Sequence, residues 1–96
     1  MGNHTGTIDD NIHVYDEDVE DRCDMQAFSV ALRQKMDASR DKGRGGWRTC
    51  PPDRLRQMLA EHVQKGDPRD VALFCMMLWR MGERTAASQQ KDANHG

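Results

Sequence analysis

Four polar side chains close to one short junction could bind a metal ion. They are Glu61, His62, Asp67 and Asp70. Glu61 falls in the last turn of one expected helix and Asp70 in the first turn of the next, so their carboxylates can approach across the junction. Such hard oxygen ligands could hold Mg²⁺ together with several waters. The spacing therefore offers a metal site formed by Glu61, Asp67 and Asp70.

The same residues also have a structural explanation, and we favour it. Asp67 stands before Pro68, as a helix-capping residue does, because its carboxylate can accept hydrogen bonds from free N–H groups. Asp70 stands three residues after the cap, in the position of a capping-box partner at the positive end of the helix dipole. Glu61 is then a solvent-facing charge, and His62 borders an apolar stripe. No residue is assigned a catalytic role.

A glycine-rich loop at residues 41–49 could bind an anion through Lys42, Arg44, Trp47 and Arg48. Glycines let backbone amides approach a phosphate, cations attract it, and an indole can stack on a base. The spacing matches neither the P-loop nor the dinucleotide fingerprint. A plain connector, with Trp47 folded over a small core, explains the same residues. The net charge of −2 and the acidic N-terminal segment argue against a general nucleic-acid-binding protein.

Three helices must position these residues, which predicts an all-α fold. The first, at about 25–40, carries one apolar stripe with three- and four-residue steps. That stripe consists of Met25, Phe28, Leu32 and Met36. The second helix, at 52–65, follows two prolines and has its apolar residues on one face. The third, at 68–81, ends before Gly82, which can adopt the left-handed conformation that stops a helix. The short junction between the last two helices permits only an antiparallel helical hairpin.

Both ends of the chain differ in composition from this helical domain of residues 25–82. Residues 9–24 contain eight acidic side chains and one arginine, and residues 83–96 contain no large apolar side chain. Segments this polar bury too little surface to offset the conformational entropy lost on ordering. We therefore expect a flexible, disordered acidic arm at 1–24 and a disordered polar tail at 83–96.

The third helix is apolar on nearly every face, so the other two helices cannot cover it completely. The side chains left over for an interaction surface are Leu73, Met76, Met77 and Trp79. A domain of this size has a marginal core and often gains support from a partner subunit. Methionines, of which the chain has seven, adapt well to partners. We expect a homodimer of antiparallel hairpins.

The cysteines and the hydropathy pattern indicate a cytoplasmic protein. The three cysteines are an odd number without a CxxC pair, so free thiols in a reducing compartment are expected. Residues 1–15 lack the apolar stretch of a signal peptide, and the longest apolar run, residues 71–79, is too short to span a membrane. No membrane association is expected.

The stretch from Lys42 to Glu83 resembles small phage and prophage proteins that share the pattern KGxGGW…LxxHxxKGDPxDVAxFxMxLW. This chain reads KGRGGW at residues 42–47 and LAEHVQKGDPRDVALFCMMLW at residues 59–79. Residues 27–36 fit the same family, and both tails lie outside it. The resemblance implies a small accessory protein in a bacterial host cell. Such a protein would act as a protein-interaction module, through self-association or by binding a host protein.

A second resemblance, to MazG-like all-α nucleotide pyrophosphohydrolases, covers only the hairpin. Those enzymes carry E-x-x-E on one helix and E-x-x-D on the next. Residues 67–77 are similar to the second half, with Asp67 in place of the glutamate, whereas Gln64 stands where the first half requires a second acid after Glu61. This resemblance implies an alternative function, Mg²⁺-dependent hydrolysis of dATP or dGTP with Glu61, Asp67 and Asp70 at the metal. Without it, no cofactor is expected.

Overall fold

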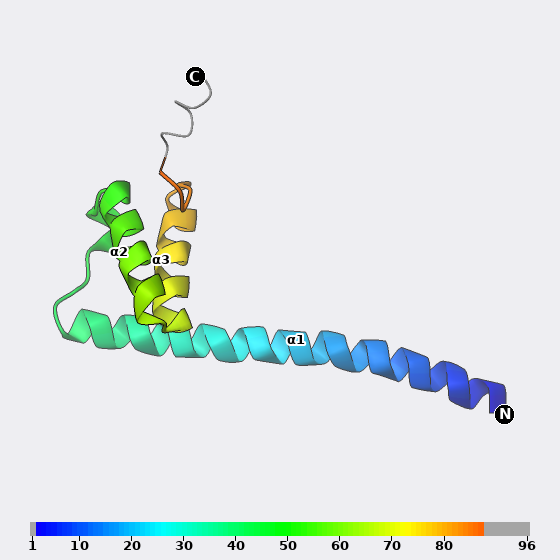
Figure 1. Ribbon diagram of the computed structural model, residues 1–96. Helices are drawn as coiled ribbons and strands as arrows, with labels where there is room; N and C mark the ends of the chain where they lie inside the picture. Colours follow the sequence, from blue (N-terminus) through cyan, green and yellow to red (C-terminus); the bar gives the residue numbers. More distant parts are fainter. Residues whose placement is uncertain (1, 88–96) are drawn as a thin grey trace, which may run out of the picture. The chain divides into compact units, whose positions relative to one another are not determined.

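The regular secondary structure of the described residues consists of helices alone, which confirms the all-α prediction (Figure 1). The computed structural model describes the backbone of residues 2–87 and the side chains of residues 16–87. The elements are α1 (Gly2–Asp41), the 3₁₀ helix η1 (Trp47–Thr49), α2 (Pro52–Lys65) and α3 (Pro68–Arg80). The chain divides into two units, Met1–Val30 and Ala31–Gly96. The second unit includes the C-terminal part of α1 and all of η1, α2 and α3.

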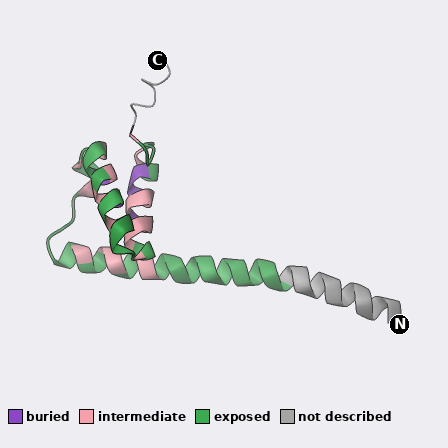
Figure 2. Ribbon diagram, viewed as in Figure 1, coloured by how far each residue is buried: buried purple, intermediate pink, exposed green. Residues whose placement is uncertain are grey.

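Helix α1 begins much earlier than the sequence indicated, and this corrects the boundary expected at residue 25. The segment 2–24, expected to be a disordered arm, is helical. A physical reason is that no glycine or proline interrupts residues 7–41. An exposed ion pair also joins Arg22 to Asp18 one turn earlier, with 3.0 Å between Nη2 and Oδ2. Every side chain from residue 16 to residue 30 is exposed (Figure 2).

Helices α2 and α3 pack against each other as an antiparallel hairpin, with Gly66 and Asp67 as the only connecting residues (Figure 1). Gly66 has a left-handed backbone (φ 95°), and its N–H donates to the carbonyl of His62 at 3.0 Å. Such a conformation is readily adopted only by glycine. Asp67 then caps α3 by accepting a hydrogen bond from the backbone N–H of Arg69 at 2.9 Å. The two helices cover the expected ranges to within one residue.

The core of the second unit is small and lies between α2 and α3. Its buried members are Leu55, Leu59, Leu73, Met77 and Leu78. Leu78 is completely buried and Leu55 is 1% exposed. Leu32 and Met36, from the end of α1, and Trp47, from η1, pack against this cluster. The apolar stripe of α1 is thus covered at its C-terminal end, in the second unit.

The segment after α3 is held against α2 at its start. Gly82 has the left-handed backbone (φ 76°) that the sequence indicated. The guanidinium of Arg56, 11% exposed, pairs with the carboxylate of Glu83, and its Nε donates to the carbonyl of Arg84 at 2.9 Å. The first two residues of the predicted tail therefore contact α2. The rest of that predicted tail, residues 88–96, lies outside the described residues.

Within residues 2–87, no helix combines the length and the apolar composition needed to cross a membrane.

Candidate functional site

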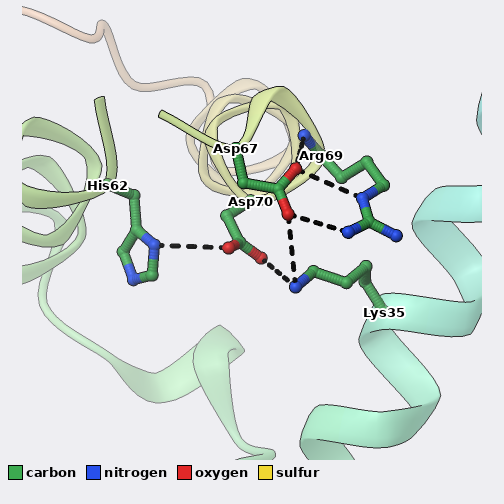
Figure 3. Close-up of polar contacts among 5 residues, drawn as sticks. All are labelled: Lys35, His62, Asp67, Arg69 and Asp70. Carbon is green, nitrogen blue, oxygen red and sulfur yellow. Dashed lines mark hydrogen bonds and ion pairs between the residues drawn. The ribbon is translucent and has the colours of Figure 1, made fainter. Parts of the chain in front are cut away.

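Two of the expected metal-site residues, Asp67 and Asp70, take part in a network of charged side chains at the hairpin turn (Figure 3). Asp67 Oδ1 lies 3.2 Å from Arg69 Nε, and its Oδ2 lies 2.8 Å from Arg69 Nη2. The same carboxylate accepts the capping hydrogen bond from the Arg69 backbone. The side-chain hydrogen bonds of Arg69 are the main cause that lowers the pKa of Asp67 far below its ordinary value of 3.8, followed by the backbone hydrogen bond. Asp67 in turn raises the pKa of Arg69.

Lys35, which no sequence pattern singled out, joins the end of α1 to this network. Its Nζ lies 3.0 Å from Asp70 Oδ1 and 3.7 Å from Asp67 Oδ2. The side chains of Lys35 and Asp67 are each 31% exposed and that of Asp70 is 23% exposed, so the ion pairs are partly shielded from water. A cation from α1 therefore neutralises the first turn of α3.

His62 completes the network from α2. Its Nδ1 lies 3.5 Å from Asp70 Oδ2, and the imidazole packs against the ring of Phe74 with 5.0 Å between ring centroids. Nδ1 is inaccessible to solvent and forms no hydrogen bond with the described residues, although Asp70 Oδ2 lies within ion-pair distance. His62 thus borders the core, as expected, and Asp70 contacts Lys35 and His62 rather than acting as a capping-box partner.

The three carboxylates proposed for Mg²⁺ do not fit that role in this arrangement. The oxygens of Asp67 and Asp70 already face Lys35, Arg69 and His62. Glu61 is exposed and belongs to none of these contacts. Among the side chains of residues 16–87, no three His, Cys, Asp or Glu residues are grouped so that they could hold a metal ion. The network neutralises its own charges, and its geometry suits a cap and a tertiary ion pair.

A pocket of about 550 Å³ opens beside the network. Lys35, His62 and Asp70 lie at its polar wall, while Leu55, Leu73, Phe74 and Met77 contribute apolar wall. A mixed lining of this kind, with a few polar groups on an apolar surface, is typical of small-ligand pockets. The pocket also reaches the glycine-rich loop, where it is lined by Lys42, Arg44 and Trp47.

The loop residues proposed for anion binding lie around two neighbouring pockets. Arg44 and Trp47 line both pockets, Lys42 lines the one beside the hairpin turn, and Arg48 lines the second, of about 360 Å³. The guanidinium of Arg48 stacks over the Trp47 ring, 4.4 Å from its centroid. Arg40, a cation directly before the loop in the sequence, and Arg80, from the last turn of α3, complete the second pocket. Spacing in the sequence did not point to Arg80.

The expected interaction surface on α3 is only partly exposed, and this corrects the prediction. Leu73 and Met77 are each 8% exposed and belong to the core, because α2 covers that side of α3. Met76 is half-buried, whereas Trp79 is 77% exposed. Other exposed apolar side chains lie on α1, where Met25 is 75% and Phe28 41% exposed.

Comparisons of this chain with protein-family models, with curated proteins and with solved structures found no match.

Proposed function

We propose that this protein is a small phage-type accessory protein that works as a helical interaction module and self-associates through α1. The observation that carries the proposal is the exposure of Met25 and Phe28. These two side chains share their helical spacing with Leu32 and Met36, which pack against the core. The phage setting is supported by the sequence resemblance over residues 42–83.

The apolar stripe of α1 favours a second copy of the chain as the partner. An interface between identical subunits related by a two-fold axis uses the same patch on both, so each exposed Phe28 meets an identical surface. Two antiparallel helices can pack such stripes together at an inclination of about 20°. Pairing would remove the side chains of Met25 and Phe28 from water. Burial of apolar surface is the main favourable contribution to the free energy of most protein association.

The distribution of charge favours the antiparallel direction. Eight of the sixteen acidic residues lie between Asp9 and Asp24, whereas thirteen of the fourteen lysines and arginines follow Met25. An antiparallel pair centred near Phe28 brings the acids before Met25 of one copy toward Arg33 of the other. A parallel pair would instead align the two acidic segments, and like charges at close range repel.

A matched pair of substitutions on α1 tests the proposal. Phe28→Glu puts a charge into the proposed interface, while Val30→Glu puts the same charge at a 51% exposed position on another face of the helix. Light scattering on a size-exclusion column should give the monomer mass for Phe28→Glu and the dimer mass for Val30→Glu. If both variants keep the same mass as the unmodified chain, the interface is not at Phe28.

The two alternatives from the sequence gain no support from the described contacts. Pyrophosphohydrolase activity requires carboxylates free to hold Mg²⁺, and those of Asp67 and Asp70 are engaged by Lys35 and Arg69. This activity stays a prediction from the resemblance to MazG-like enzymes. Binding of a host protein likewise stays a prediction, because no described feature specifies such a partner.

A further inference from the structure

The second pocket lined by Trp47 is strongly basic. Four arginines line it, Arg40, Arg44, Arg48 and Arg80, and its lining among the described residues includes no acid. These side chains come from α1, the glycine-rich loop, η1 and α3, so residues 40 positions apart supply charge to one cavity of about 360 Å³. A concave site lined by one sign of charge concentrates counter-ions of the opposite sign.

Most of this positive charge has no acidic partner in the part of the chain that the structure describes. Within residues 16–87, Arg44, Arg48 and Arg80 form no ion pair, and Arg40 has one long contact, 3.4 Å from its Nη2 to Asp37 Oδ1. By contrast, Arg56 and Arg69 are each paired with a carboxylate. The stacking of Arg48 on Trp47 fixes the guanidinium at the pocket wall without neutralising it.

The remaining lining suits a phosphate group attached to a larger molecule. Gly45 and Gly46 have no side chain to separate their backbone from a ligand, and Gly46 holds the left-handed conformation (φ 84°) that shapes the loop. Met36, Met76 and the Trp47 ring provide apolar wall next to the charge. Guanidinium groups form paired hydrogen bonds with phosphate oxygens, which makes arginine the usual residue for phosphate recognition.

We propose that this pocket binds a small phosphate-bearing anion, held by Arg40, Arg44, Arg48 and Arg80 beside Trp47. This inference is independent of self-association, since none of these residues belongs to the proposed α1 interface. The ligand class is a pyrophosphate or a nucleoside phosphate. In either ligand, phosphate oxygens would contact the arginines. A nucleoside phosphate also has a base that could contact the apolar wall, whereas pyrophosphate does not.

Tryptophan fluorescence of the full-length chain tests the site directly. Trp79 is exposed and does not line the pocket, so Trp79→Phe leaves Trp47 as the only tryptophan. Titration with inorganic pyrophosphate, at constant ionic strength, should change the Trp47 emission in a saturable manner. Arg44→Gln and Arg80→Gln should each weaken binding by about ten-fold or more. The control Arg54→Gln, an exposed arginine of α2 outside both the pocket and the proposed α1 interface, should change binding by less than about two-fold.

A second titration, with AMP, shows whether the nucleoside part of a ligand contributes to its affinity. Tighter binding of AMP than of pyrophosphate assigns the pocket to a nucleoside phosphate, and the reverse order assigns it to the phosphate group alone. Amide shifts of Gly45 and Gly46 on adding pyrophosphate to the unmodified ¹⁵N-labelled chain provide a readout without any substitution. A fluorescence change that does not saturate, together with unshifted amides, would overturn the proposal. So would an equal loss of binding in Arg54→Gln and Arg44→Gln.

Discussion

The ammonium group of Lys35 lies 3.0 Å from Asp70 Oδ1, and this ion pair joins the end of α1 to the first turn of α3 (Figure 3). The two residues are far apart in the sequence, and together with Asp67 they form the polar part of the contact between these elements. The apolar part consists of Leu32 and Met36 against the core.

Removing this ion pair should destabilise the fold modestly. The two side chains are 31% and 23% exposed, so water screens part of the attraction, and we expect about 0.5–1 kcal/mol of coupling. A double-mutant cycle with Lys35→Met and Asp70→Asn, followed by urea unfolding, measures the coupling. Strictly additive effects would show that the pair contributes nothing to stability.

Acid should weaken the fold partly through Asp67. Its pKa is lower in the folded chain than the ordinary 3.8, so the folded state binds fewer protons than the unfolded state as the pH falls below about 4. The stability that Asp67 contributes is fully present above its unfolded pKa and is lost below it. Urea unfolding at pH 5 and at pH 3 should show a larger loss in the unmodified chain than in Asp67→Asn. An equal loss in both proteins would contradict this role for Asp67.

The hairpin connection should depend on glycine at position 66. Its φ of 95° is strained for any residue with a Cβ atom, so Gly66→Ala should cost roughly 1–2 kcal/mol although the space beside it is open. Gly45→Ala is the control, because Gly45 has no left-handed φ and its added Cβ would meet only Arg40 Cγ at 3.6 Å. Thermal unfolding followed by circular dichroism measures both, and a normal midpoint for Gly66→Ala would refute the prediction.

Two adjacent residues of α3 should differ sharply in their effect on stability. Leu78 is completely buried, and its replacement by alanine should cost about 2–5 kcal/mol through lost burial and a residual cavity. Trp79 is 77% exposed, so Trp79→Ala should change the free energy of unfolding by about 0.5 kcal/mol or less. Comparable losses in the two variants, in the same urea titration, would indicate that Trp79 is covered by a partner.

Local signals in the sequence were sufficient for the hairpin. The structure has every local feature that the sequence indicated for the two hairpin helices. Each begins with a proline, Asp67 caps the second, and Gly66 and Gly82 have left-handed backbones where the helices end. Such features depend only on residues that are neighbours in the sequence. The early start of α1 was not predictable from apolar periodicity, which marks only helices that pack against a core. Residues 2–24 lack it, yet they also lack any glycine or proline after Gly6 that would stop a helix.

The contacts of the site depend on residues distant in the sequence, and these were not predictable from spacing. Lys35 reaches Asp70 only because α1 packs near the hairpin turn, and Arg40 and Arg80 meet at one pocket for the same reason. Counting the apolar faces of α3 likewise could not show that α2 covers Leu73 and Met77 while Trp79 remains exposed. The net charge of −2 is a sum over the whole chain, so it does not show that the acidic residues are concentrated before Met25 and the basic residues after it.

Sedimentation equilibrium of the unmodified chain over a wide concentration range tests the central claim, self-association through α1, most directly. If α1 pairs with a second copy, the average mass should rise from the 11.0 kDa of one chain to twice that value as concentration increases. The Phe28→Glu variant should stay at 11.0 kDa under the same conditions. An unmodified chain that remains at the monomer mass throughout would contradict the account, and the exposure of Met25 and Phe28 would then need another explanation.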